Sequence, residues 1–321
     1  MELEPVDAVT VTTLVDNVTD LLLTDDGPAK RVPLARAVRL TGDALRAEHG
    51  FSALVAVTKG DRTTRILFDA GLSRDGLVDN MRRLEIDPTD IDLIVLSHGH
   101  WDHTTGMDGL IKALGRTSLP VLIHPEFWSR RRVALPNADP VELPSTSKQA
   151  LEGAGFDIVE DEQPSFLLDG SLLVTGEVDR TTPFEQGHPF FQAYRHGHWE
   201  PDPLILDDQA LVANLRDKGL VVITGCGHSG IVNILRYAQR LTGQPKIHAV
   251  IGGFHLSGPV FEPILAPTCD ALEQLAPDYL VPTHCTGWKA IHAMAARFPE
   301  RFVQNSVGTR FELVTDTPAG A

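Results

Sequence analysis

The feature that most constrains the fold is a unit that occurs three times in the last third of the sequence. In each copy, an apolar strand runs into a loop that contains a histidine, and a helical pattern follows the loop. The copies share this order of elements without sequence identity. The predicted strands cover residues 220–223, 248–251 and 279–282. Strands that alternate with helices in this way are typical of a layered α/β protein.

Histidines gather in the loops that end these strands. His228, His255 and His284 follow the three repeated strands, and a fourth predicted strand, residues 91–96, runs into another histidine-rich segment. Six of the 13 histidines lie in these four loops. Ligands of α/β proteins bind at the carboxyl ends of strands. We therefore expect these histidines to meet at one edge of the sheet and to form a metal site.

The segment after residue 96 holds four potential metal ligands within six residues. His98 and His100 lie two residues apart on an extended turn, so both imidazoles can face one ion. Asp102 and His103 lie where the chain enters the next helix, and they point to a second position. Gly99 permits the tight backbone path between them. Imidazole and carboxylate suit one or two Zn²⁺ ions, although the same ligand types leave iron or manganese open.

The rest of the chain is predicted to begin with β-strands and to continue with helices and one irregular region. Strands are predicted over 8–15, 51–58 and 64–68, and helices over 77–84 and about 106–114. We expect a single domain over 1–321 with an irregular, aromatic-rich excursion at about 176–207. The aromatic side chains of this excursion form either the wall of a pocket or a separate hydrophobic cluster. Its Arg180 and Arg195 either bind a substrate anion or are solvated.

The charge balance limits the possible partners. The chain has 28 Lys+Arg and 43 Asp+Glu, which gives a formal net charge of −15. Nucleic acid is not expected as a partner, because phosphates must be neutralised by basic side chains, whereas a small-molecule substrate remains compatible. No apolar stretch is long enough to span a membrane, and the acidic start lacks a secretory leader. Three cysteines suggest a reducing compartment, so we expect a cytoplasmic protein whose oligomeric state the sequence leaves open.

The motifs resemble those of a known family. The run His-Gly-His-Trp-Asp-His at residues 98–103 matches the H-x-H-x-D-H signature of the metallo-β-lactamase superfamily, and Asp69-Ala70-Gly71 resembles its upstream D-x-G turn. The order of the other motifs is similar to that of the dihydropteroate-synthase-like branch. These further motifs are residues 14–17, 48–52, 175–178, 225–233, 252–256 and 282–287. The resemblance covers nearly the whole chain.

This resemblance implies a fold and a set of metal ligands. The fold is an αββα sandwich, in which two mixed β-sheets are flanked by helices and a metal centre lies at one edge. Carried over by position, the metal ligands are His98, His100, Asp102, His103, His228 and His284. Many members supply a bridging aspartate from a T-G-D turn, where this chain has Cys226 after Thr224-Gly225. Whether Cys226, His228 or His255 takes that place stays open at this point.

The function expected from these features is metal-dependent hydrolysis. A metal-activated hydroxide would attack an ester, phosphoester or lactone-like small molecule. Asp102 is expected to orient this nucleophile, and His255 to protonate the leaving group. Two alternatives remain. One is a synthase that joins a pterin alcohol diphosphate to an aminobenzene ribotide, and the other is a non-catalytic ligand-binding protein that keeps its metal for structure.

Overall fold

The structure is a computed structural model that describes residues 2–34 and 44–316. One of its two large sheets has seven strands in the order β11-β12-β15-β16-β17-β18, with β1 paired to β15. Its strands are β1 (Pro5–Val6), β11 (Ser165–Leu167), β12 (Leu172–Val174), β15 (Ala210–Leu215), β16 (Gly219–Thr224), β17 (Ile247–Gly253) and β18 (Tyr279–Thr283). Both parallel and antiparallel pairs occur, so the sheet is mixed.

The other large sheet has eight strands in the order β10-β7-β6-β5-β4-β2-β19-β3 and is also mixed. Its strands are β2 (Ala8–Val15), β3 (Ala29–Lys30), β4 (Ser52–Lys59), β5 (Arg62–Phe68), β6 (Leu93–Val95), β7 (Pro120–Ile123), β10 (Asp157–Glu160) and β19 (Arg310–Val314). The hairpin β4–β5 turns at Gly60 with a positive φ of 58°, as the run Lys59-Gly60-Asp61 leads one to expect.

Alternation along the strands explains why the two sheets pack face to face. In β16, Val221 and Ile223 lie in the core between the sheets, whereas Leu220 and Val222 lie in the core beneath the helices. Successive side chains of a strand point to opposite faces. A strand that is apolar on both faces must therefore be covered on both sides.

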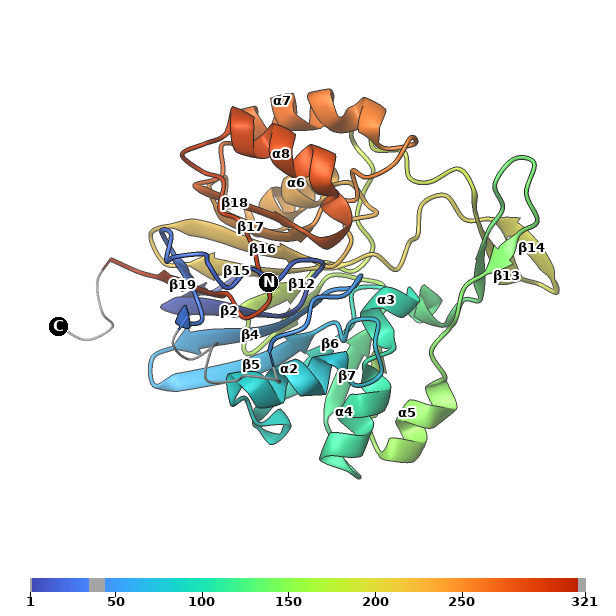
Figure 1. Cartoon of the computed structure of the whole chain (residues 1–321), viewed down its shortest axis with the longest axis horizontal. Coiled ribbons are helices and arrows are strands. Elements are labelled where there is room, and N and C mark those ends of the chain that lie inside the picture. Colours follow the sequence, from blue (N-terminus) through green and yellow to red (C-terminus); the bar gives the residue numbers. More distant parts are fainter. Residues whose placement is uncertain (1, 35–43, 317–321) are drawn as a thin grey trace.

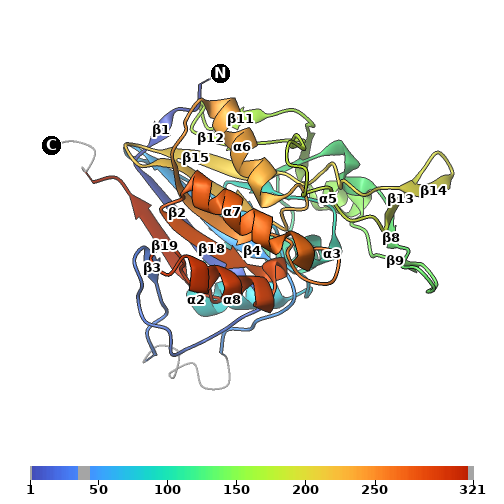
Figure 2. The ribbon, with the colours of Figure 1, turned by 90° about the horizontal axis from the view of Figure 1, so that it is seen from above.

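Helices cover the outer face of each sheet (Figures 1 and 2). The helices α6, α7 and α8 pack on the seven-stranded sheet, and α2 and α4 pack on the eight-stranded sheet. The bounds are α2 (Gly76–Leu84), α3 (Trp101–Thr104), α4 (Met107–Leu114), α5 (Lys148–Ala154), α6 (Ile231–Thr242), α7 (Leu265–Leu275) and α8 (Trp288–Arg297). This layering confirms the predicted αββα sandwich. No helix within the described ranges is long and apolar enough to cross a membrane.

A third, four-stranded sheet projects from one side of the sandwich (Figure 1). Its order is β14-β13-β8-β9. Its strands are β8 (Arg131–Val133), β9 (Val141–Glu142), β13 (Phe191–Arg195) and β14 (His198–Pro201). The excursion that we predicted as irregular therefore contains a hairpin, β13–β14. The single domain over 1–321 stays a prediction, and residues 1, 35–43 and 317–321 of that span lie outside the described ranges.

Candidate metal centre

The histidine loops come from both large sheets. The loop with His98 follows β6 of the eight-stranded sheet, whereas those with His228, His255 and His284 follow β16, β17 and β18 of the seven-stranded sheet. The sequence predicted that these loops meet at the edge of one sheet, whereas in the structure they come from two sheets. The loops meet where the ends of two stacked sheets lie together, and this brings ligands of very different sequence position within reach of one another.

Three imidazoles form the first group of potential ligands. The His98 Nε2 atom lies 3.0 Å from His100 Nδ1, which lies 3.1 Å from His228 Nε2. All three side chains are buried. Nitrogens around a tetrahedral zinc ion, at about 2.0–2.1 Å from it, lie about 3.3 Å apart. The observed spacing is close to that value.

Burial keeps these imidazoles neutral. It lowers the pKa of His98, His100 and His228 well below the usual value, and neighbouring histidines lower each pKa further. Arg131 adds to this effect on His98 and His100. A neutral imidazole presents a lone pair to a cation without first losing a proton. The group is therefore ready to bind metal at neutral pH.

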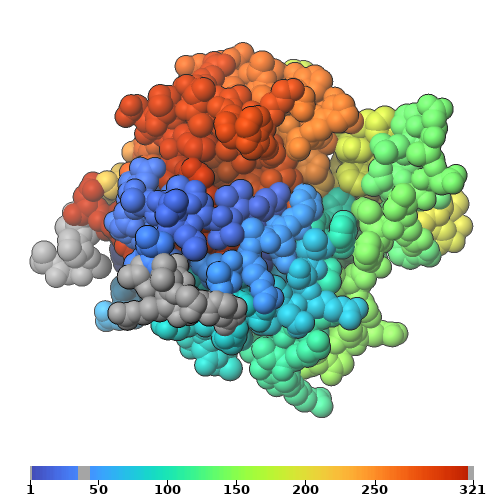
Figure 3. Space-filling model, in the orientation of Figure 1, coloured from blue at the N-terminus to red at the C-terminus, as the bar shows by residue number. Residues whose placement is uncertain are grey.

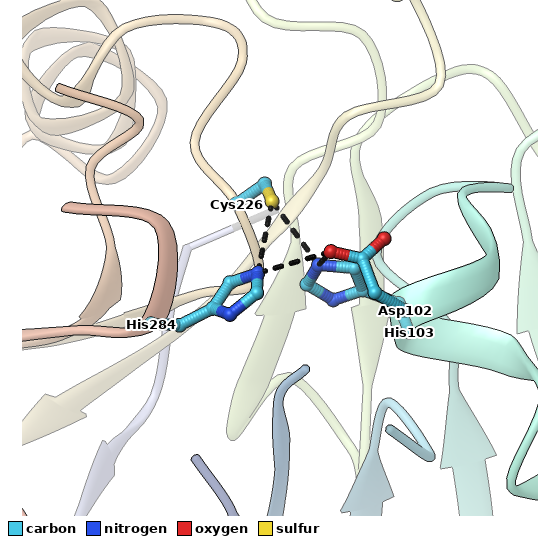
Figure 4. A group of neighbouring side chains, drawn as sticks. All are labelled: Asp102, His103, Cys226 and His284. Carbon is cyan, nitrogen blue, oxygen red and sulfur yellow. Dashed lines mark hydrogen bonds and ion pairs between the residues drawn. The ribbon is translucent and has the colours of Figure 1, made fainter. Parts of the chain in front are cut away.

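Four side chains form the second group and point toward one another (Figure 4). They are Asp102, His103, Cys226 and His284, all buried. The Cys226 Sγ atom lies 3.1 Å from His103 Nε2 and 3.4 Å from His284 Nε2. The His284 Nε2 atom lies 3.3 Å from Asp102 Oδ2. One thiol, one carboxylate and two imidazoles are ligand types that zinc prefers. Cys226 therefore joins this group, whereas His228 joins the first.

Hydrogen bonds behind the ligands fix which nitrogen faces the centre. The Nδ1 atom of His103 lies 2.7 Å from Asp69 Oδ2, and that of His284 lies 3.0 Å from Asn17 Oδ1. On the other side, Ser97 Oγ lies 2.9 Å from His98 Nδ1. Each bond occupies Nδ1 and leaves Nε2 facing the other ligands. Histidines in metal sites are held in this manner. The sequence drew attention to Asp69 through its D-x-G turn, but its role as a hydrogen-bond partner emerges only from the fold.

The protonation state of His103 differs from that of the three histidines in the first group. Burial lowers the pKa of His103, but the carboxylates of Asp69 and Asp102 outweigh burial and raise it to about 9. Burial likewise raises the pKa of the Cys226 thiol. In the metal-free protein His103 therefore carries a proton and Cys226 is a thiol. A bound cation would displace both protons.

Replacing Asp69 by asparagine is expected to weaken zinc binding at the second group by about 10- to 100-fold. Asparagine has an amide group in place of the carboxylate whose Oδ2 atom orients His103. Zinc affinity would be measured by competition with a chromophoric chelator. The matched control is Asp61→Asn in the exposed β4–β5 turn, which should leave affinity unchanged. Equal affinity of both variants and the wild type would contradict the role given to Asp69.

Gly99 is required for close packing rather than for an unusual backbone angle. A Cβ atom at Gly99 would overlap the carbonyl oxygen of Phe127. Gly99→Ala is therefore expected to lower the free energy of unfolding by about 1–3 kcal/mol, the usual range for overpacking. Urea titration measures this. The control is Gly153→Ala in α5, where nothing lies within 4 Å of the added atom, and a similar loss in both variants would contradict the steric explanation.

Two buried polar atoms near this centre lack a hydrogen-bond partner among the described residues. The Nε2 atom of His100 and the Nδ1 atom of His255 are buried without a hydrogen-bond partner in the described part of the chain. His255 stacks over His228 at 4.1 Å between ring centroids, and Cys226, His228 and His255 together form a third group of potential ligands. Cys226 therefore belongs to both the second and the third group of potential ligands. The donor set fits the metal ions that the sequence predicts.

A cavity of about 520 Å³ opens onto both groups. The donors that line it are His100, Asp102, Cys226, His228, His255 and His284. His49 also lines it, with Nε2 3.5 Å from Asp102 Oδ2. Of the excursion, only the first residue of strand β13 lines this cavity. Phe191 lines the cavity and packs on His100 at 5.1 Å between ring centroids.

The other excursion residues have structural contacts. Tyr194 and Trp199 pack on each other, with the Arg130 guanidinium over both rings. Arg195 forms ion pairs with Glu126 and Asp202. Arg180 donates a hydrogen bond to the carbonyl of Leu204 and does not line the cavity. Contact of either arginine with a substrate anion, one of the two alternatives that the sequence left open, is not tested by these contacts.

Comparison with known proteins identifies the family. A model described as a beta-lactamase superfamily domain matches residues 64–158. The chain is also 33% identical over 267 residues to the 7,8-dihydropterin-6-methyl-4-(β-D-ribofuranosyl)-aminobenzene-5′-phosphate synthase of Methanocaldococcus jannaschii, covering 81% of this chain and 88% of the synthase. The chain belongs to the metallo-β-lactamase superfamily.

Solved structures agree with this membership of the metallo-β-lactamase superfamily. Tm1679, a metal-dependent hydrolase of the β-lactamase superfamily, superposes with a TM-score of 0.71 at 25% identity, over 96% of this chain and all of that one. YhfI of Bacillus subtilis, a metallo-β-lactamase fold protein, superposes with a TM-score of 0.50 at 14% identity, over 95% of this chain and all of that one. YhfI shows the fold alone. One relative is thus a synthase and another a hydrolase, so the reaction must be argued from the site.

Proposed function

We propose that the protein is a metal-dependent hydrolase that acts on an ester, phosphoester or lactone-like small molecule. The observation that supports this most strongly is the pair of neighbouring donor groups at an open cavity. We assign one ion to His98, His100 and His228. We assign a second to Asp102, His103, Cys226 and His284, with zinc as the metal because a thiol and imidazoles dominate the set.

Once bound, such a cation supplies a water whose pKa falls to about 7 and a Lewis acid beside the substrate. The chain's own residues position the reactants. Asp102 Oδ2 lies within 3.3–3.8 Å of His284 and His103 Nε2, so this carboxylate is held at the inner wall of the cavity. There it can accept a hydrogen bond from the attacking water and orient it.

His255 is placed to move a proton. It lies at the cavity, partly exposed, and stacks on His228. We propose that it donates a proton to the leaving oxygen as the bond to the acyl or phosphoryl centre breaks. Phe191 packs on His100 and forms part of the cavity wall.

A second candidate is the synthase reaction. The observation that favours it is 33% identity with the archaeal synthase over most of both chains. In that reaction a pterin alcohol diphosphate joins an aminobenzene ribotide and diphosphate leaves. No lysine or arginine of the described ranges lines the cavity, so the diphosphate would depend on the metal centre for its binding. The same metal-binding side chains would then support attack by an amine in place of water.

One assay separates the candidates. Zinc-loaded protein is incubated with a panel of aryl and alkyl phosphoesters, esters and lactones, and in parallel with a pterin alcohol diphosphate with and without an aminobenzene ribotide. Turnover of panel members supports the hydrolase. Diphosphate release that requires the ribotide supports the synthase. No turnover on either arm, with metal bound, contradicts both and favours a binding protein.

The proposed setting of the enzyme is the cytoplasm, with a small molecule as its partner. All three cysteines, Cys226, Cys269 and Cys285, are buried and free. Free thiols persist where the surroundings are reducing, and a thiol among the proposed ligands requires them. This observation supports an intracellular location for the active form.

A further inference from the structure

A second cavity adjoins the one at the metal centre. Its volume is about 470 Å³, within the range of small-molecule sites. Asn17, His284, Gly287 and Trp288 line both cavities. The two cavities therefore meet at a proposed metal ligand. We call the second one the Trp288 groove, and a molecule whose reacting bond lies at the metal centre could extend directly into it.

The groove lies between the C-terminal helix and residues close to the N-terminus. Ile291 and Ala295 of α8 line one side together with Phe302, and Val18 lines the other. On the face drawn in Figure 3, the C-terminal residues, in red, adjoin the N-terminal residues, in blue. The groove therefore has apolar side chains on both of these walls, and His284 is the one proposed metal ligand among the described residues that line it.

Trp288 forms a rigid aromatic surface at the junction of the cavities. Its side chain is 75% exposed, and its ring packs on that of His292 at 3.9 Å between centroids and 35° between planes. The preceding Gly287 has a φ of 79°, and a Cβ atom there would collide with Ser257. The turn that presents Trp288 therefore requires glycine at position 287. Flat, exposed aromatic surfaces of this kind stack on other rings.

One buried polar atom in the groove lacks a partner. Thr283 is 1% exposed and lines the groove, and its Oγ1 atom has no hydrogen-bond partner in the described part of the chain. A buried hydroxyl without a partner is costly. A polar atom on a bound ring would satisfy it.

The carboxylate of Asp16, which lines the groove, already accepts hydrogen bonds from within the protein. Asp16 accepts hydrogen bonds from the backbone N–H groups of Asn17 and His284 and from the Asn305 side chain. No lysine or arginine is among the described residues that line the groove. A charged group would lack a counter-charge there, so an uncharged occupant fits best.

We propose that the Trp288 groove binds a planar, uncharged aromatic ring of the substrate, with a hydrogen-bonding group on the ring facing Thr283. The assignment rests on the proposed function, because the reacting ester or phosphoester of the same molecule lies at the metal centre. Trp288 is thus a specificity-determining residue, and substrates without an aromatic part should be poor ones.

Two probes test this assignment separately from the metal chemistry. 2-Naphthamide carries a ring and no anion, and reports the groove alone. 2-Naphthylmethylphosphonate, which water does not cleave, reports the ring and the metal together. Binding of each is measured by ligand-observed NMR on zinc-loaded wild type, Trp288→Leu and Trp288→Tyr. The matched control is Trp199→Leu, on the hairpin β13–β14 away from the groove.

We expect 2-naphthamide to bind about tenfold more weakly to Trp288→Leu, with Trp288→Tyr within about threefold of the wild type, since stacking requires an aromatic ring. Trp199→Leu should bind like the wild type. Saturable binding that does not change in Trp288→Leu, or no binding to the wild type, would overturn the groove assignment.

The phosphonate keeps the two proposals distinguishable. Tighter binding of the phosphonate than of the amide that is lost on removal of zinc, together with weaker binding of both probes to Trp288→Leu, supports both proposals. If zinc makes no difference but Trp288→Leu still weakens binding of the amide, the groove assignment stands and the proposed metal function fails. If zinc strengthens phosphonate binding equally in wild type and Trp288→Leu, and the amide does not distinguish them, the groove assignment fails and the metal function stands.

Discussion

Replacement of Asp102 by asparagine is expected to reduce turnover by about 100-fold or more while the fold stays intact. Asp102 contributes the only carboxylate of the second donor group, and Oδ2 lies 3.3 Å from His284 Nε2. An amide is a poorer metal ligand and a weaker hydrogen-bond acceptor for the attacking water. Initial rates on the best panel substrate measure the effect, and circular dichroism and Tm measure the fold.

The control for this variant is Asp108→Asn at the start of α4. Asp108 is exposed and forms a surface ion pair with Arg74, so its replacement should leave the rate unchanged. Turnover of Asp102→Asn within about threefold of the wild type, with metal content preserved, would contradict the catalytic role of this carboxylate. If turnover is lost together with the fold, the fold assays reveal it.

Removal of the metal is the second change for which we expect a large effect, on both Tm and turnover. A ligand present at 1,000 times its Kd stabilises the native state by about 4 kcal/mol. Dialysis against a strong chelator should therefore lower Tm by several degrees and abolish turnover. The buried imidazoles of His98, His100 and His228 would then face one another at 3.0–3.1 Å with no cation between them.

Add-back identifies the metal. Zinc, manganese and ferrous iron are each returned to the stripped protein after the chelator has been removed by gel filtration. We expect zinc to restore both Tm and turnover. A stripped protein that melts and turns over like the untreated sample would mean that these side chains serve neither stability nor catalysis through a metal.

The layers of the fold could be predicted because they depend on local patterns. The strand predicted at 8–15 matches β2, and the helix predicted at about 106–114 matches α4, which ends at Gly115 with a φ of 68°. Such elements follow from apolar periodicity and from glycine at the helix end. The predicted strand 91–96 shortens to β6 (Leu93–Val95), with two residues lost at its start and one at its end.

The small projecting sheet could not be predicted in the same way. Strands β13 and β14 pair mainly with each other and with β8, and their burial is mixed. A half-exposed hairpin lacks the alternation of apolar side chains that marks a strand covered on one face. The hairpin is held in place by long-range contacts, such as the ion pairs of Arg131 with Asp202 and Asp207. These pairs join residues about 70 positions apart in the sequence.

The proposed ligands and most of their division between two ions were accessible to sequence reasoning, but the place of Cys226 was not. Spacing alone groups His98 with His100 and Asp102 with His103. It cannot decide between Cys226 and His228, which lie two residues apart on one loop. The fold separates them, because the φ of 67° at Gly227 turns the chain between them. Cys226 then faces His103 and His284, whereas His228 faces His100.

The most direct test of the account is an anomalous-scattering map at the zinc edge, from crystals of protein whose metal content has been measured. We predict one peak within bonding distance of His98, His100 and His228, and a second within bonding distance of Asp102, His103, Cys226 and His284. A map without a peak between these side chains, in protein that is active, would contradict the metal centre on which the proposed function depends. A map that leaves two or more of these residues unbound would contradict the assignment of ligands.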